Sequence, residues 1–202
     1  MSKDPAASAA STTDGFSLVD EGPLSTKERR LLGLLRAGYD EQMLRDVLLP
    51  FIDQTSPISL RALDWAVVNW SKKHNVVCAS RLPGEQTNVY GAYKTTLNFW
   101  KRRLFDPFRR RARIPVVIGG VRHETTLGQA NFALFAHLTG ILAYVLSNID
   151  AIEDDMNRVA QAQKRLNSEA RSSGVHRKRK ELTPTSSGLC VAYTAPRRVR
   201  VR

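Results

Sequence analysis

The sequence predicts an α+β fold that is mainly helical, with a small antiparallel β-hairpin or sheet, a disordered N-terminal arm and a basic C-terminal tail. Three observations carry this prediction. Apolar residues recur at helical spacing over much of residues 25–170, two short extended runs flank a Gly-Gly pair, and both ends of the chain are polar. At 202 residues, of which 42% are hydrophobic, the chain has the size of one domain with tails.

The first two segments predict an arm and a helix pair. Residues 1–24 are rich in Ala, Ser, Thr, Asp and Gly, so they bury little apolar surface and we expect a disordered arm that is not a signal peptide. Residues 25–54 predict an acidic helical hairpin, in which Ser25 and Glu28 have the spacing of a capping box and Pro50 ends the second helix. This pair is an appendage, a docking element for a partner, or a layer on the basic body.

Residues 55–170 predict the α+β core domain. Helical periodicity favours a helix over residues 60–73 and another over residues 90–105. Between them, residues 76–79 have strand composition, and residues 81–88 read as a loop built on Pro-Gly.

A hairpin and a long helical stretch complete the core. Gly119-Gly120 lies between two extended runs, which is a hairpin signal, and Pro115 predicts that the first of these strands is an edge or bulged strand. Thr126 is the expected N-cap of the following helix, whose apolar stripe continues through Val159. Polar residues and two glycines within residues 127–146 argue against a membrane span. The acidic residues 153–155 are expected to form a solvated face.

The positive charge is concentrated in two clusters. The net charge is +12, but residues 1–56 carry −3 and residues 57–202 carry +15. Residues 94–122 hold nine basic side chains and one acid, and residues 171–202 hold nine and one again. Such a field attracts polyanions, of which nucleic acid is the usual one. An acidic protein, a membrane surface or simple solubility are the alternatives.

We therefore expect a nucleic-acid interface made of phosphate-binding cations. The candidate residues are Lys94, Lys101, Arg102, Arg103, Arg109, Arg110, Arg111, Arg113, Arg177, Lys178, Arg179, Lys180, Arg197, Arg198, Arg200 and Arg202. Aromatic residues interleave with the first cluster, and they either stack on bases or belong to the core. The second cluster lies in a basic C-terminal segment, residues 171–202, with a terminal strand of alternating Arg and Val; its residues 176–180 are similar to a nuclear-import patch.

Motifs for catalysis or cofactor binding are missing from the sequence. Cys78 and Cys190 form no disulfide framework or zinc cluster, and the four histidines show no metal-binding spacing. There is no phosphate-binding glycine loop, and Asp64, Asp106 and Glu124 have no spacing that would pair them. We expect a protein without cofactor, metal or enzymatic activity; an enzyme of unrecognised type is the remaining alternative.

Five pieces of the sequence, taken in order, carry a resemblance. They are residues 58–74 (ISLRALDWAVVNWSKKH), 105–110 (FDPFRR), 125–132 (TTLGQANF), 152–157 (IEDDMN) and 178–182 (KRKEL). Together they resemble a family of uncharacterised proteins of nucleocytoplasmic large DNA viruses, the giant viruses of algae and amoebae. The Phe-Asp-Pro-Phe and Thr-Thr-Leu-Gly-Gln pieces are the specific ones.

The resemblance extends over residues 57–202 and implies a viral origin and a shared fold, but no established activity. Our first hypothesis is a non-enzymatic, virus-encoded protein that binds nucleic acid without strong sequence preference, in viral gene expression or genome packaging. It would work in the host nucleus or a cytoplasmic virus factory. The second is a structural or interaction protein of the virion or virus factory, whose basic surface holds an acidic protein partner.

Overall fold

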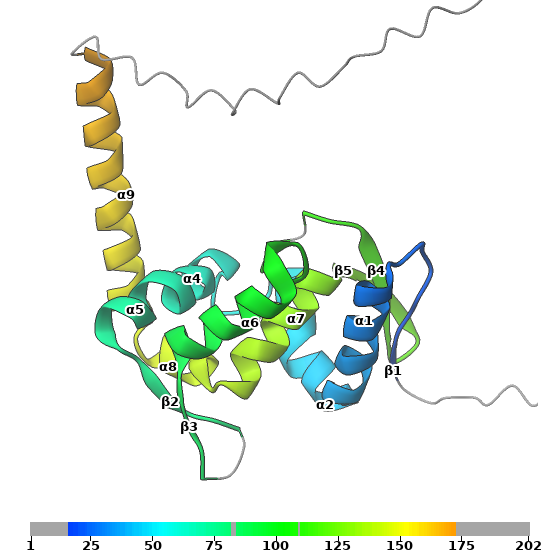
Figure 1. The fold of residues 1–202 in the computed structure, drawn as a ribbon. Helices are drawn as coiled ribbons and strands as arrows, with labels where there is room; N and C mark the ends of the chain where they lie inside the picture. Colours follow the sequence, from blue (N-terminus) through cyan, green and yellow to red (C-terminus); the bar gives the residue numbers. More distant parts are fainter. Residues whose placement is uncertain (1–15, 82–83, 109, 173–202) are drawn as a thin grey trace, which may run out of the picture. The chain divides into compact units, whose positions relative to one another are not determined.

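The computed structural model describes residues 16–81, 84–108 and 110–172 (Figure 1). These residues fall into two compact units, which meet between Asn157 and Arg158. The predicted end of the core domain at residue 170 stays a prediction. The basic C-terminal segment with its terminal strand lies outside the described residues beyond Ser172.

The first unit is mainly helical with small antiparallel sheets, which confirms the predicted fold class. The helices and helical turns are α1 (Thr26–Gly38), α2 (Glu41–Met43), η1 (Leu44–Leu48), α3 (Leu49–Asp53), α4 (Leu60–Trp65), η2 (Ala66–Trp70), α5 (Ser71–His74), α6 (Val89–Leu104), α7 (Leu127–Leu138), α8 (Ile141–Ser147) and α9 (Ile149–Ser172). The strands are β1 (Phe16–Leu18), β2 (Val77–Ala79), β3 (Gln86–Asn88), β4 (Arg113–Ile118) and β5 (Val121–Thr126). The turns η1 and η2 are π-helical, and α9 belongs to the first unit only up to Asn157.

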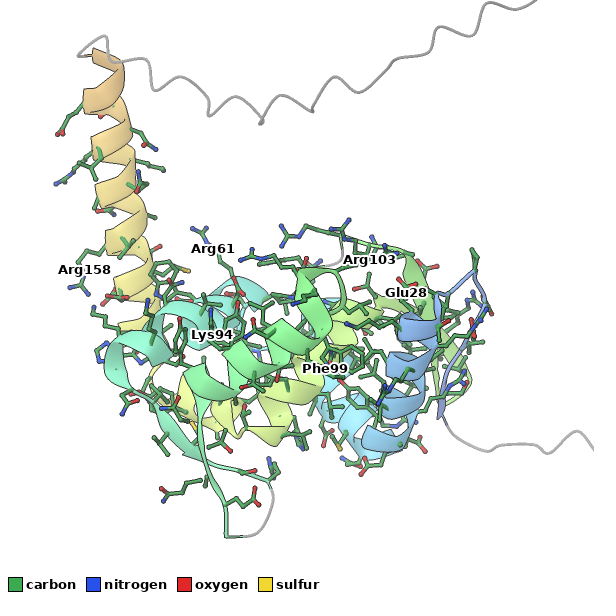
Figure 2. The ribbon with its side chains drawn as sticks, in the orientation of Figure 1. Glu28, Arg61, Lys94, Phe99, Arg103 and Arg158 are labelled. Carbon is green, nitrogen blue, oxygen red and sulfur yellow. The ribbon has the colours of Figure 1, made fainter. Side chains whose placement is uncertain are left out.

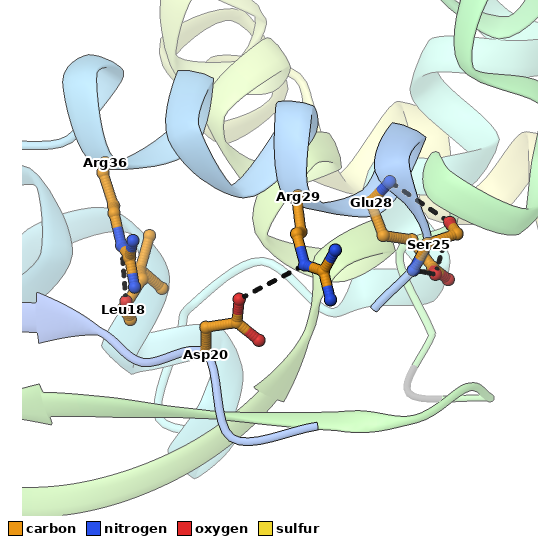
Figure 3. A network of polar contacts seen from close by, with 6 residues as sticks. All are labelled: Leu18, Asp20, Ser25, Glu28, Arg29 and Arg36. Carbon is orange, nitrogen blue, oxygen red and sulfur yellow. Dashed lines mark hydrogen bonds and ion pairs between the residues drawn. The ribbon is translucent and has the colours of Figure 1, made fainter. Parts of the chain in front are cut away.

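Strand β1 corrects the prediction of a disordered arm at residues 16–18, whereas residues 1–15 of that predicted arm lie outside the described residues. Residues 16–18 pair antiparallel with β4, and the Leu18 side chain is buried in the core. The Arg36 guanidinium donates to the Leu18 carbonyl at 2.7 Å, and Arg29 lies 3.9 Å from Asp20 (Figure 3). Arginines of helix α1 therefore hold β1 and the residues after it in place. Such long-range contacts cannot be read from the composition of the segment.

Pro115 lies in the central strand of the sheet, in continuous register with both neighbours, and not in an edge or bulged strand as predicted. The strand order is β1-β4-β5, and Gly119-Gly120 forms the predicted hairpin turn between β4 and β5. In an antiparallel ladder the N–H and C=O of one residue face the same neighbour. The Pro115 carbonyl accepts from the Val19 N–H, so its missing N–H faces β1 just beyond the last ladder pair, Leu18 with Val116. The β4–β5 ladder therefore loses no hydrogen bond to the proline.

Two further elements differ from the sequence-based expectation. Residues 86–88, expected in a loop, form β3 and pair with β2, so the predicted strand has a hairpin partner. Pro50 does not end its helix, which continues through α3 to Asp53. The Leu49 N–H donates to the carbonyl of Leu44, five residues back, and this widened π-helical turn precedes the proline and accommodates its ring.

Helix α7 is the centre of the unit. Every residue from Leu127 to Ala136 is buried, and α1, α6, α8, η1 and β5 all contact this helix (Figure 1). Thr126 caps it as predicted, accepting from the Gln129 N–H at 3.2 Å. The helix ends at Leu138, and Gly140, with a φ of 74°, separates it from α8 and breaks the long predicted stripe. A Cβ on Gly140 would lie 2.2 Å from the Ala79 carbonyl oxygen.

The acidic helix pair is part of the same core. The Tyr39 hydroxyl donates to the Ala130 carbonyl at 2.8 Å, and Leu31, Leu32 and Leu35 of α1 are buried. Both α1 and η1 contact α7. Of the three alternatives that the sequence left open, packing against the body is the one the structure adopts.

Two pieces of the family resemblance meet at the start of α7. The Asp106 N–H donates to the Gly128 carbonyl at 3.3 Å, and the Asn131 amide donates to the Leu104 carbonyl at 2.7 Å. A Cβ on Gly128 would lie 3.2 Å from the Asp106 nitrogen. Phe105 packs against Phe132 and Phe135, with ring centroids 5.2 Å apart in both pairs. The Phe-Asp-Pro-Phe and Thr-Thr-Leu-Gly-Gln segments therefore pack directly against each other.

The predicted capping box is present at the start of α1. The Glu28 carboxylate accepts from the Ser25 amide at 2.9 Å and from its hydroxyl at 2.7 Å, and the Ser25 hydroxyl accepts from the Glu28 N–H at 3.4 Å (Figure 3). The other carboxylate oxygen accepts from Arg103 at 3.0 Å. The Ser25 hydrogen bonds, together with the positive charge of Arg103, hold the pKa of Glu28 below its ordinary value.

Gly128→Ala is expected to lower the free energy of unfolding by about 1–3 kcal/mol, because the new methyl group presses on backbone rather than on a side chain that can rotate away. Gly33→Ala is the matched control: Gly33 lies inside α1, a Cβ there meets nothing within 4 Å, and alanine favours the helix. Denaturant unfolding of both variants measures the difference. Equal midpoints for Gly128→Ala and the wild type would show that the contact is loose.

Glu28→Gln is expected to destabilise the protein at pH 7 by about 0.5–1 kcal/mol, because charged acceptors make the stronger hydrogen bonds. Since the pKa of Glu28 is lower in the folded state, its ionised form stabilises the fold above about pH 4.3, and this contribution is lost as the pH falls through the folded value. Unfolding curves of the wild type and the variant should therefore converge in acid. Glu41→Gln, which removes an exposed acid paired with Arg45, controls for the loss of charge. A gap between wild type and Glu28→Gln that persists at low pH would contradict the assignment.

Candidate nucleic-acid interface

The described residues contain part of the predicted interface. Seven of the candidate cations are described: Lys94, Lys101, Arg102, Arg103, Arg110, Arg111 and Arg113. The others lie outside the described residues: Arg109, Arg177, Lys178, Arg179, Lys180, Arg197, Arg198, Arg200 and Arg202. The seven come from α6, from the segment that follows it, and from the start of β4.

Helix α6 sets the direction of the first four cations. Its inner face buries Val89, Tyr93, Trp100 and Leu104, which leaves Lys94 exposed on the outer face. At Lys101 the backbone adopts a φ of 64° and interrupts the helix. Positive φ is unusual for a residue with a side chain and needs support from its surroundings. Lys101 lies at this kink, Arg102 and Arg103 follow it, and all three side chains are exposed.

Two of the seven cations are bound to carboxylates. Arg110 donates to both oxygens of the buried Asp106 at 2.9 Å, and the Phe108 N–H donates to the same carboxylate at 3.1 Å. The Arg110 guanidinium also lies 5.1 Å from the centre of the Phe108 ring. Arg103 is paired with Glu28. The carboxylates of Glu28 and Asp106 therefore already compensate the charges of these two arginines, which stabilise the local structure.

The other five cations are available to a ligand. Lys94, Lys101, Arg102, Arg111 and Arg113 have exposed side chains that form no ion pair or hydrogen bond with another described residue. Exposed, uncompensated cations of this kind are what phosphate contacts require.

One further acid, Asp64 of α4, lies among these cations. Burial raises the pKa of Asp64, and the negative charge of Asp106 raises it further, whereas Arg102 and Arg110 lower it. The spacing of the sequence gave no reason to pair Asp64 with Asp106, yet the two carboxylates lie close enough to interact electrostatically. Asp106 is bound to Arg110, and Asp64 offsets part of the charge of Arg102 without an ion pair, so neither acid is placed to compensate Lys94, Lys101, Arg111 or Arg113.

The structure adds residues that the sequence analysis did not select. Arg61 is exposed on α4, one helical turn before Asp64, and Figure 2 shows it at the same edge as Arg103. Lys27 of α1 donates to the Phe99 carbonyl at 2.6 Å and lies 5.5 Å from the centre of the Phe99 ring. The helical register of residues 60–73 is a signal that could have found Arg61. No sequence signal connects Lys27, in the acidic segment, with α6.

The acidic residues 153–155 do not form a wholly solvated face, as the sequence had led us to expect. The Asp155 carboxylate is buried and accepts from the Trp65 indole at 3.2 Å and from Lys73 at 2.6 Å. Glu153 is half-buried and Asp154 is exposed. Asp155 therefore ties the first turns of α9 to α4 and α5, a structural role.

A pocket of about 590 Å³ lies beside the Phe108 ring. Phe51, Ile58, Gln129 and Glu153 are among its lining residues, and Glu153 is the one ionisable side chain in this lining. Among the described residues no three His, Cys, Asp or Glu side chains are placed to hold a metal ion. Within the same part of the chain, no single helix has the length and apolar composition to cross a membrane. Helices α7 and α8 have that length and composition only when taken together, and the pair is bent by 77°.

Comparison with known proteins places this fold in a family. The profile described as "Family of unknown function (DUF7197)" matches residues 26–190. An uncharacterized protein of Acanthamoeba polyphaga mimivirus is 30% identical over 136 residues, which are 63% of this chain and 52% of that protein. The chain thus spans about half the length of this curated relative. No solved structure matches it.

The resemblance to uncharacterised proteins of giant viruses is confirmed by the family match and by the mimivirus relative. The match also includes the helix pair at residues 26–53, which the resemblance drawn from the sequence did not cover. The chain belongs to the DUF7197 family.

Proposed function

We propose that this protein binds nucleic acid through phosphate contacts, without strong sequence preference, and serves viral gene expression or genome packaging. It acts without catalysis, in the host nucleus or in a cytoplasmic virus factory. One observation carries the proposal: Lys94, Lys101, Arg102, Arg111 and Arg113 are exposed and form no ion pair with a carboxylate among the described residues, whereas Glu28 and Asp106 are bound to Arg103 and Arg110.

The physical basis is the release of counterions. Each phosphate that a Lys or Arg neutralises frees condensed cations from the nucleic acid, so the affinity falls with salt by a slope of about 0.9 per phosphate on a duplex. Unpaired side chains contribute more to this effect than Arg103 and Arg110, which would first have to leave Glu28 and Asp106. The same unpaired cations would also suit an acidic protein of the virion or virus factory, which is our second candidate.

Changing Lys94, Arg102 and Arg111 together to Gln is expected to weaken nucleic-acid binding and to flatten the salt slope by up to about 3, one unit per lost phosphate contact. The matched control changes Arg29, Arg45 and Arg122 to Gln. These three arginines are exposed but paired with Asp20, Glu41 and Glu21, so the net charge drops equally while the proposed interface stays intact.

Fluorescence titration of labelled DNA and RNA from about 50 to 300 mM salt measures both slopes. Equal weakening by the two triple variants would mean that only net charge matters and that these residues form no interface. An absence of binding at the lowest salt would exclude nucleic acid and favour the acidic protein partner.

The basic residues beyond the described part of the chain are expected to add to the same binding. Deleting residues 177–202 removes eight Lys and Arg side chains and one Glu. If these cations contact phosphates, the deletion lowers the affinity and the salt slope further when combined with the triple Gln variant. An unchanged slope in the deletion variant would restrict the interface to the first basic cluster.

A further inference from the structure

We propose that Phe99 is a stacking platform for a nucleobase, so that the ligand of this surface is a single-stranded nucleic acid. This inference rests on the proposed function and specifies its ligand class. It starts from the aromatic residues that interleave with the first basic cluster. The structure buries Tyr93, Trp100 and Phe105, and leaves the Phe99 side chain 54% exposed.

Phe99 is exposed because of its position on α6. The buried residues of this helix are Val89, Tyr93, Trp100 and Leu104, and Phe99 shares the outer face with Lys94, Thr95 and Asn98. Lone apolar side chains are common on protein surfaces and need no ligand. Phe99 differs from these because it is held in place and lies among cations.

The neighbours of Phe99 restrict its ring. The Trp100 ring meets it edge to face, with centroids 4.7 Å apart at an angle of 90°. The Lys27 ammonium lies over the ring, 5.5 Å from its centre, and donates to the backbone carbonyl of Phe99, which fixes this lysine at the ring. A ring that is already oriented loses little conformational freedom when a base stacks on its exposed surface.

Cations flank the ring along the helix and across to α1. Lys94 precedes Phe99 by five residues of regular helix, about 7.5 Å along the axis and about 140° around it, so the two side chains leave opposite flanks of the exposed face. Lys101 follows two residues later, and Lys27 approaches from α1. Figure 2 shows Lys94 and Phe99 along α6, with Arg103 near its end. An exposed aromatic ring with a cation held against it, on a helix that carries further cations, has the two kinds of group that bind single strands with little sequence preference.

The geometry separates single strands from duplexes. In a duplex both faces of each base are covered by neighbouring bases, so Phe99 has nothing to stack on and only the phosphate contacts remain. In a single strand the base faces are accessible, and the stacking adds to the phosphate contacts. The preference should hold for both DNA and RNA, since every base offers a π-face.

The test uses the full-length protein with a labelled single strand of mixed sequence and with the duplex made from it, at about 100 mM salt. Phe99→Ala is expected to lower the single-strand affinity about 5- to 150-fold and to change the duplex affinity less than about two-fold. Phe99→Trp, which keeps an aromatic ring, should bind as the wild type does. Leu146→Ala, which removes an apolar side chain 49% exposed on α8, should bind both ligands unchanged.

The possible results separate this inference from the proposed function. Salt-dependent binding of both ligands with no effect of Phe99→Ala overturns the stacking platform and leaves the phosphate contacts standing. Equal losses for single strand and duplex also overturn it, because stacking cannot act on a duplex. If neither ligand binds, the proposed function fails first. Unfolding midpoints equal to that of the wild type show that the variants are folded, and the Phe99→Trp result checks the ring independently of Phe99→Ala.

Discussion

The close approach of Asp106 to Gly128 is the constraint on which the rest of the unit depends. Helix α7 is buried along its first ten residues, so whatever packs against its start must come within backbone distance. Gly128 permits this because it has no side chain, and the Asp106 N–H uses the approach to donate to the Gly128 carbonyl. Asn131 adds a hydrogen bond to the Leu104 carbonyl, at the end of α6. Helix α6 and the segment after it are thereby fixed on the central helix.

The contact between Asp106 and Gly128 also positions the residues of the basic surface. Phe105 enters the core between Phe132 and Phe135, and Asp106 turns its carboxylate to Arg110 and to the Phe108 N–H. The segment that carries the arginines therefore leaves the core in a defined direction. A buried ionised carboxylate needs partners that compensate its charge, and here the basic cluster supplies one of its own members. Because Arg110 is bound to Asp106, phosphate contacts in this segment fall to Arg111 and Arg113, which have no such partner.

Long-range ion pairs divide the basic residues into those with a carboxylate partner and those without one. Glu28 with Arg103 and Glu21 with Arg122 join segments that lie far apart in the sequence, and Asp155 with Lys73 does the same. Exposed ion pairs contribute little to stability, but they decide which cations remain uncompensated. A surface that is positive by composition alone would attract any polyanion. The basic surface of this protein also carries the exposed, ordered ring of Phe99, which phosphate contacts alone would not need.

The sequence by itself determined the local features: the starts of α1, α4 and α7, the capping box at Ser25, the Gly-Gly hairpin and the mainly helical class. Each depends on residues a few positions apart, so spacing and side-chain chemistry suffice. The tertiary structure alone decided that β1 joins the sheet, that Pro115 lies in a central strand, and which cations are paired. These outcomes depend on contacts between distant segments, such as Arg103 with Glu28, 75 residues apart. Local periodicity carries no information about such contacts, because it fixes the face of an element and not the neighbour that covers it.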